Sequence, residues 1–137
     1  MIKVIAFDFN GVLFPTPRRI NVTVFDFVKE CKELGYMLVA ASNASKGSFE
    51  WRSNEYGLMN YFDGRIISSD IGIRKPSRKF FEYMVEILGY LPEQILLIDD
   101  TDINLESARS LGIMSVKYEN DGSLDNIREI LENDRQN

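Results

Sequence analysis

Residues 2–12 of this chain read IKVIAFDFNGV. The mainly apolar run at residues 2–7 is typical of a strand that is buried on both faces. The run ends at Asp8, and the turn former Gly11 follows three positions later. A carboxylate there adds little to a core, but at the carboxyl end of a parallel strand it presents a nucleophile or a metal ligand. Asp8 is therefore the first candidate functional residue.

Apolar runs alternate with helical periodicities along the rest of the chain. Four further runs predict strands, at residues 37–41, 65–68, 95–98 and 113–117. Apolar stripes predict helices around residues 24–34, 81–88, 105–111 and 124–131, a less regular helical stretch at 51–58, and a polar tail from Asn133 that frays. This alternation predicts an α/β fold, a three-layer α/β/α sandwich with a parallel, doubly wound (Rossmann-like) sheet of about five strands.

Length and composition limit the alternatives. A chain of 137 residues is one domain, which we expect to span residues 1–137. The net charge of −5 argues against a nucleic-acid partner, and no apolar run is long enough to span a membrane. The amino terminus has no signal-peptide pattern, and the single cysteine, Cys31, suits a reducing compartment, so we expect a cytoplasmic protein. Cys31 lies on an apolar helical stripe and is expected to be buried and inert.

The chain contains no histidine. This excludes serine–histidine and cysteine–histidine nucleophile pairs, zinc sites that use histidine, and the usual general base near neutral pH. Catalysis must then use carboxylates, lysine, hydroxyl groups and backbone amides. A bound metal is expected to be a hard ion such as Mg²⁺.

Polar residues follow the predicted strands. Asp8 follows the first strand, Ser42 and Asn43 follow the second, and Asp99 and Asp100 follow the fourth. Because the carboxyl ends of parallel strands share one edge of a sheet, we expect these side chains to meet there. Lys75, which precedes a predicted helix, is expected at the same edge.

Four segments in this order resemble the motifs of the haloacid dehalogenase (HAD) superfamily of phosphatases and related hydrolases. The segments are Asp8-Phe9-Asn10-Gly11-Val12, Ser42-Asn43, Lys75-Pro76 and Ile98-Asp99-Asp100-Thr101-Asp102-Ile103-Asn104. One such motif is a weak signal, since an acidic turn after a strand is common. Four in order, at strand ends and over nearly the whole chain, are a strong signal.

The resemblance implies a Mg²⁺-dependent hydrolase that acts on a phosphate ester. Asp8 would attack phosphorus and form an aspartyl-phosphate. The metal would be held by Asp8, the backbone carbonyl of Asn10 and Asp100. Asp99 and Asn104 would support this first shell of ligands, as variants of the fourth motif that such proteins tolerate.

The resemblance also implies how the phosphoryl group is bound. Ser42 and Asn43 would donate hydrogen bonds to its oxygens, and the backbone amides of Phe9 and Asn10 would add donors. Lys75 would neutralise developing charge and hold the nucleophile in place.

Asn10 departs from the phosphatase pattern. HAD phosphatases have an aspartate there, which protonates the leaving group and later activates water. Loss of a general acid–base typically costs about 10²–10⁴ in rate, so the chain could form the phosphoenzyme yet turn over slowly. Dehalogenases and phosphonate-cleaving members also lack this acid, so its absence does not imply an inactive site. An engineered aspartate-to-asparagine change would give the same sequence.

Two other function classes stay open beside the phosphatase. One is a catalytically weak protein that binds a phosphorylated ligand and regulates; the other is a metal-independent dehalogenase-type hydrolase that uses Asp8. About thirty residues separate Asp8 from Ser42, and about as many separate Ser42 from Lys75. Neither interval has room for a cap domain, which leaves residues 13–19 as the only candidate flap. An open site favours a large substrate, although a small molecule or a homo-oligomer whose second subunit supplies a lid also fits.

Overall fold

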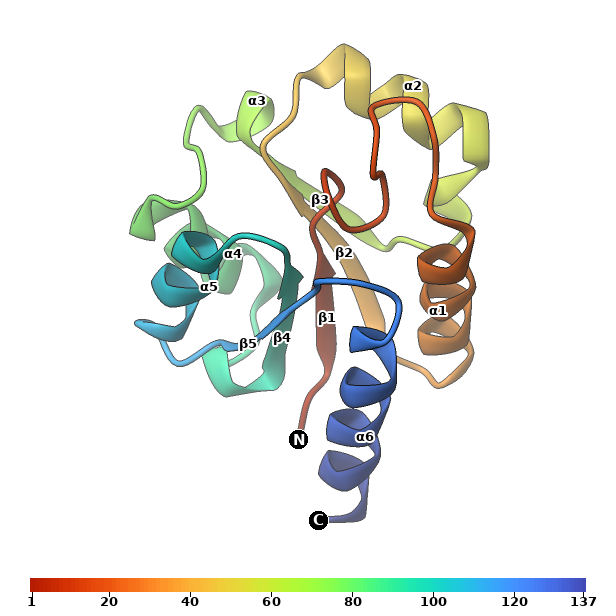
Figure 1. Cartoon of the computed structure of the whole chain (residues 1–137). Coiled ribbons are helices and arrows are strands. Elements are labelled where there is room, and N and C mark those ends of the chain that lie inside the picture. Colours follow the sequence, from red (N-terminus) through yellow and green to blue (C-terminus); the bar gives the residue numbers. More distant parts are fainter.

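The computed structural model describes all residues, 1–137, and its centre is a five-stranded parallel sheet (Figure 1). The strands are β1 (Val4–Phe7), β2 (Met37–Ser42), β3 (Gly64–Ile67), β4 (Ile95–Asp99) and β5 (Met114–Lys117). Their order across the sheet is β3-β2-β1-β4-β5, and every neighbouring pair is parallel. The predicted doubly wound sheet of about five strands is confirmed.

Helices cover both faces of this sheet. The α-helices are α1 (Val22–Glu33), α2 (Lys46–Tyr56), α3 (Ser68–Ile71), α4 (Arg78–Leu88), α5 (Asp102–Arg109) and α6 (Ser123–Gln136), and the 3₁₀ helices are η1 (Leu58–Asn60) and η2 (Pro92–Gln94). Figure 1 shows α1 and α6 on one face and α4 and α5 on the other. None of the helices has the length and apolar character needed to cross a lipid bilayer.

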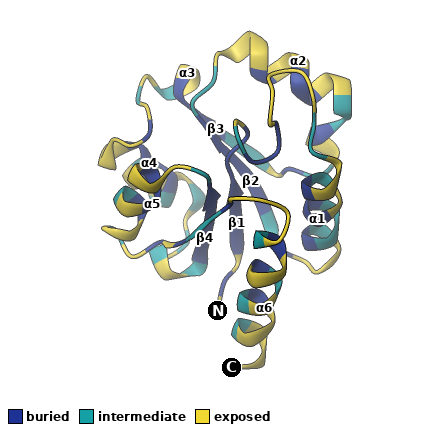
Figure 2. Cartoon of the chain, viewed as in Figure 1, coloured by how far each residue is buried: buried dark blue, intermediate teal, exposed yellow.

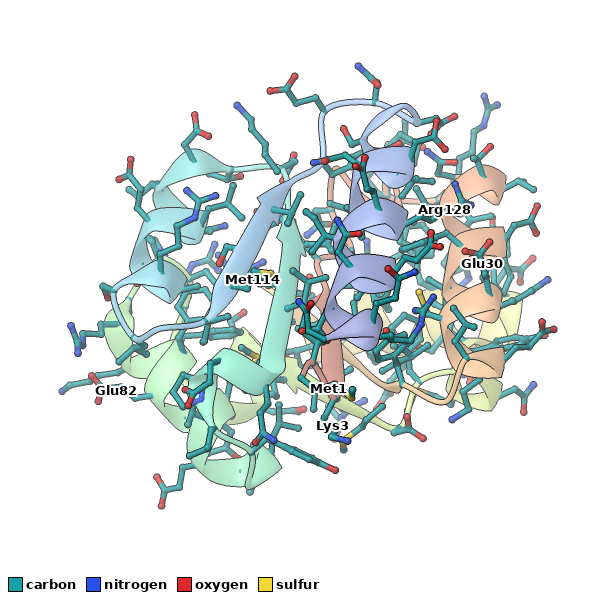
Figure 3. The ribbon with its side chains drawn as sticks, turned by 90° about the horizontal axis from the view of Figure 1, so that it is seen from below. Met1, Lys3, Glu30, Glu82, Met114 and Arg128 are labelled. Carbon is teal, nitrogen blue, oxygen red and sulfur yellow. The ribbon has the colours of Figure 1, made fainter.

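Alternation along each strand divides the core into two apolar layers. Ile5 and Phe7 of β1 pack toward α1 and α6, whereas Val4 and Ala6 pack toward α4 and α5. All four side chains are buried, as the dark sheet in Figure 2 shows. At the helix layer of the first face, Arg128 of α6 donates to Glu30 of α1 at 2.9 Å, a pair that Figure 3 labels. Burial on both faces explains why the strands read as continuous apolar runs.

The predicted helical stretch at residues 51–58 is confirmed in part. The helix α2 begins earlier, at Lys46, and ends at Tyr56, and Gly57 separates it from η1. Its buried face contains Arg52 and Ser53 beside Phe49, so the apolar periodicity is hidden by polar residues.

The predicted fraying from Asn133 is wrong, since α6 continues to Gln136. The Asp134 carboxylate accepts a hydrogen bond from the Ile2 amide at 2.7 Å, and Arg135 donates to the Tyr36 hydroxyl at 2.9 Å. Tertiary contacts therefore hold the last turn of a polar helix.

Candidate active site

A polar cleft of about 310 Å³ lies at the carboxyl ends of the strands, the upper edge of the sheet in Figure 1. Eight residues line it and none is hydrophobic: Asp8, Asn10, Gly11, Asn43, Lys75, Asp100, Thr101 and Asn104. Six of these are residues that the sequence singled out, and Gly11 and Thr101 are additions. The predicted site residues Phe9, Ser42 and Asp99 are not part of the lining.

Lys75 is the central cation of this cleft. Its ammonium nitrogen lies 3.0 Å from Asp8 Oδ1 and 2.7 Å from Asp99 Oδ2, and it also donates to the Ala41 carbonyl at 2.8 Å. Its side chain is only 2% exposed. Three oxygen partners match the three donors of an ammonium group, so Lys75 is fixed in place.

Asp99 lies beneath the cleft and is fully buried. Besides Lys75, it accepts hydrogen bonds from the Thr101 amide at 2.9 Å and from the Asn104 side chain at 3.3 Å. Both carboxylate oxygens are therefore engaged from within the chain. Asp99 thus holds Lys75 and the start of α5 in place.

Asp8 is buried at the end of β1. Burial raises the pKa of its carboxyl to about 7, and the nearby carboxylates of Asp99 and Asp100 add to the rise while Lys75 opposes it. Carboxylate oxygens of Asp8, Asp99 and Asp100 all lie within 4.8 Å of one another. One ammonium group does not balance three carboxylates, so the site favours a further cation.

The donor set fits a hard divalent ion such as Mg²⁺. Asp8 and Asp100 both line the cleft, and the Asn10 carbonyl oxygen beside them accepts no hydrogen bond from within the chain. Two carboxylates and a carbonyl are the oxygen ligands that Mg²⁺ uses in proteins. Asp99 is less suited to be a direct ligand because its oxygens are already engaged.

Gly11 is required by the close approach of the β1 and β4 loops. It has a φ of +84°, and a Cβ atom built on it would overlap the Asp100 carboxylate. Glycine therefore allows Asp100 to approach the loop that carries Asp8.

Asn43 joins two of the loops. Its side-chain oxygen accepts from the Lys75 amide at 2.8 Å, and its side-chain nitrogen donates to the Lys75 carbonyl at 2.9 Å. One side-chain N–H of Asn43 is left for a ligand. In this arrangement Asn43 also positions the segment that carries Lys75.

Ser42 and Phe9 lie behind the lining. Ser42 is fully buried, and its hydroxyl has no hydrogen-bond partner within the chain. Phe9 packs in the core, where its ring stacks on Phe49 with centroids 4.9 Å apart. The backbone amides of Phe9 and Asn10 donate no hydrogen bond within the chain. This hydroxyl and these two amides are unsatisfied donors at this edge, and such donors suit an anion.

The candidate flap, residues 13–19, packs against α2 at its base. Phe14 is buried, and Tyr56 of α2 donates to the Arg18 carbonyl at 2.8 Å. None of its residues lines the cleft.

Arg52 is the residue near the cleft that sequence reasoning missed. It is only 2% exposed, and it donates from Nη1 to the Asn10 side-chain oxygen at 2.8 Å. Burial lowers the pKa of Arg52, while the negative charge of Asp8 opposes this. The sequence offered no signal for it, because arginines are mostly exposed and Arg52 lies in no motif.

Comparisons with known proteins identify the family. Residues 14–112 match the family of haloacid dehalogenase-like hydrolases, a range that contains Asn43, Lys75 and Asp100 but starts after Asp8. A HAD family enzyme from Bacteroides thetaiotaomicron, solved in complex with magnesium and inorganic phosphate, superposes with a TM-score of 0.77 at 18% identity. The alignment covers 87% of this chain and 95% of that chain, and at this identity it shows the shared fold.

Curated relatives match over parts of the chain. A drimenol cyclase from Aspergillus calidoustus is 36% identical over 56% of this chain and 15% of its own length. A phosphoglycolate phosphatase from Aquifex aeolicus is 31% identical over 59% of this chain and 38% of its own, and a glyceraldehyde 3-phosphate phosphatase from Methanopyrus kandleri is 25% identical over 69% and 41%. This chain spans less than half the length of each of the three. From its fold, its cleft and the match over residues 14–112, the chain belongs to the family of haloacid dehalogenase-like hydrolases.

Proposed function

We propose that this chain is a Mg²⁺-dependent phosphohydrolase that cleaves a phosphate ester through Asp8. The observation that carries this proposal is the cluster of Asp8, Asp99 and Asp100, whose carboxylate oxygens lie within 4.8 Å of one another beside Lys75. The relatives named as phosphoglycolate and glyceraldehyde 3-phosphate phosphatases support the same reaction class.

The reaction takes two displacements. A carboxylate oxygen of Asp8 attacks phosphorus, the bond from phosphorus to the ester oxygen breaks, and an aspartyl-phosphate forms. Water supplies the proton for the departing alkoxide, because the Asn10 amide cannot donate one as an acid does. The hydroxide that this water leaves then attacks phosphorus, the bond from phosphorus to Asp8 breaks, and inorganic phosphate leaves with the Asp8 carboxylate restored.

Charge balance is the main task of the surrounding groups. Asp8, Asp100 and the Asn10 carbonyl would hold Mg²⁺, which would supply positive charge and reduce the repulsion between the Asp8 carboxylate and the phosphoryl group. Lys75 pairs with Asp8 at 3.0 Å and adds a second positive charge. The free backbone amides of Phe9 and Asn10 and the remaining side-chain N–H of Asn43 offer donors to the phosphoryl oxygens.

A second candidate function is a regulatory protein that binds a phosphorylated ligand and turns it over slowly. Asn10 favours this candidate, since an uncharged amide stands where HAD phosphatases use an acid. The two candidates share the metal and phosphoryl contacts and differ only in rate.

The openness of the cleft bears on the substrate. The chain between β1 and β2 holds only α1 and its connections, and the chain between β2 and Lys75 holds α2, η1, β3 and α3. We infer that this core has no cap domain. Such a site accepts a large or macromolecular phosphate ester, or a smaller one when a second subunit covers it.

The test is release of inorganic phosphate from a panel of phosphate esters, with and without Mg²⁺. We expect turnover that requires Mg²⁺ and disappears in Asp8→Asn, because the amide is not a nucleophile. If Asp8→Asn remains as active as the wild type, the proposed reaction is wrong.

Metal binding is tested separately by calorimetric titration with Mg²⁺. Asp100→Asn is expected to weaken binding strongly, since it removes one of two anionic ligands. Equal affinity in wild type and Asp100→Asn would place the metal elsewhere.

A further inference from the structure

Arg52 is a buried cation without a carboxylate partner. It lies on the inner face of α2 and forms no ion pair, although its side chain is almost inaccessible to solvent. Its polar contacts are neutral: Nη1 donates to Asn10 Oδ1 at 2.8 Å and Nε donates to the Ser48 carbonyl at 3.4 Å. Its guanidinium also lies over Phe14, 4.9 Å from the ring centroid. A desolvated charge is costly, so this contact with Asn10 needs an explanation.

The contact fixes which way the Asn10 amide points. Arginine only donates hydrogen bonds, and the Asn43 carbonyl, which accepts from Asn10 Nδ2 at 3.0 Å, only accepts. If the amide were turned by 180°, its NH₂ group would face the guanidinium and its oxygen would face the Asn43 carbonyl. Both contacts would then be repulsive. The pair of neighbours therefore allows one orientation.

This orientation is linked to the rest of the cleft. Asn10 is exposed at the cleft wall, two residues after Asp8. Asn43, whose carbonyl accepts a hydrogen bond from Asn10, also holds the Lys75 backbone through its side chain. Lys75 in turn pairs with Asp8. A chain of polar contacts thus runs from α2 to the proposed nucleophile. Figure 1 shows α2 beside the loop that carries Asn10.

We propose that Arg52 is a positioning residue, which holds the Asn10 side chain in one orientation at the cleft wall and acts on the reaction through Asn10. The guanidinium lies behind Asn10 and is not among the residues that line the cleft. Arg52 therefore has no direct contact with the substrate. The kinetic part of the test rests on the proposed phosphohydrolase function, whereas the spectroscopic part does not.

The kinetic test is a double-mutant cycle between Arg52→Met and Asn10→Ala, with p-nitrophenyl phosphate and Mg²⁺ as the probe. Methionine keeps the apolar contact with the rings but loses the donor. We expect Arg52→Met to lower kcat by about 10²-fold with little change in KM, because the Asn10 backbone carbonyl and amide, which serve the site, are then held less firmly. In the Asn10→Ala background the same change is expected to have no further effect, and Arg52→Lys is expected to restore part of kcat.

Arg65→Met is the matched control. Arg65 also lies over an aromatic ring, Phe49, at 5.3 Å, but it pairs with Asp70 and lies outside the cleft lining. Its replacement is expected to leave kcat unchanged. An equal loss of kcat from Arg52→Met with and without Asn10 would overturn the proposal, because Arg52 would then act independently.

The spectroscopic test reads the Asn10 side-chain amide by ¹⁵N NMR, with its signals assigned by their absence in Asn10→Ala. In the wild type we expect two distinct proton signals from a fixed amide; in Arg52→Met we expect them to shift and broaden. Unchanged signals would overturn the positioning role. If the wild type hydrolyses no ester while Arg52→Met still changes the amide, the proposed function fails and the positioning role stands.

Discussion

Two buried cations flank the loop that carries Asp8, and the chain holds them in opposite ways. Lys75 lies between the carboxylates of Asp8 and Asp99, whereas Arg52 contacts a neutral amide and aromatic rings. The first arrangement is a network in which removal of the cation leaves buried negative charge. The second is a cation with no carboxylate in contact, so its removal leaves no buried charge behind. Lys75 and Arg52 are therefore buried to a similar extent, but their removal is expected to affect stability in different ways.

The largest expected effect concerns Asn10, which lies between the two cations. Asn10→Asp is expected to raise kcat by about 10²–10⁴, the usual worth of a positioned acid–base. The new carboxyl group can accept a hydrogen bond from Arg52 and, when protonated, can donate one to the Asn43 carbonyl. These are the same two contacts that the Asn10 amide makes. Steady-state kinetics on the ester panel with saturating Mg²⁺ measure the gain.

Asp8→Asn in the same background is the control, and it must abolish the added activity. An inactive Asn10→Asp protein would favour the regulatory candidate over a slowed phosphatase. Rapid turnover by the native protein would show that water already supplies the proton efficiently.

Stability separates the two cations directly. Lys75→Met is expected to lower the free energy of unfolding by about 3–5 kcal/mol, because it leaves Asp8 and Asp99 buried without a counter-charge. Arg52→Met is expected to cost much less, since methionine retains the packing and no buried charge remains. Urea denaturation of the metal-free proteins measures both changes. Equal losses would mean that the charge of Arg52 is compensated after all.

The pH dependence of stability tests whether the carboxyl group of Asp8, the partner of Lys75, has a raised pKa. In the metal-free protein the folded-state pKa of Asp8 is about 7, above the ordinary value of 3.8. Below pH 3.8 the group is protonated in both states. As pH rises from there to about 7, the unfolded chain loses this proton first, so stability falls by up to about 1.4 kcal/mol per pH unit.

This decline is measured by urea denaturation at a series of pH values. Asp8→Asn, which has no such proton, is expected to lack this contribution, and Mg²⁺ is expected to restore stability at the upper end of the range. A wild type and an Asp8→Asn variant with the same pH dependence would show that Asp8 ionises normally.

The smallest effect is expected at Cys31, a buried titratable group with no role in either cation site. It lies in the core between α1 and α6, and burial raises the pKa of its thiol to about 12. We expect no reaction of the native protein with a disulfide reagent at pH 8 and full reaction after denaturation. Rapid labelling of the native protein would show that the core opens locally.

The difference between the cations also shows what sequence reasoning could find. Lys75 stands in a short motif whose partners end neighbouring strands, and parallel strands bring such ends together whatever the side chains are. Arg52 lies in a helix, and only its tertiary neighbours place it beside Asn10. Its long polar side chain is typical of an exposed residue, and it interrupts the apolar pattern of α2.

The sequence alone determined the element order, the five parallel strands and the edge at which Asp8, Asn43, Lys75 and Asp100 meet. These features follow from local apolar periodicity and from strand direction, and both can be derived from one sequence. It also predicted Asp99 and Asn104 as supporting residues, but it did not reveal that Asp99 lies beneath the cleft with both oxygens engaged.

Only the tertiary structure decided the rest. The burial of Ser42 without a partner, the contact of Arg52 with Asn10, and the ordered end of α6 each depend on residues distant in sequence. Periodicity reports which face of an element is apolar. It carries no information about which polar groups meet once the elements pack, because hydrogen bonds and charge pairs depend on distances that only the folded chain fixes.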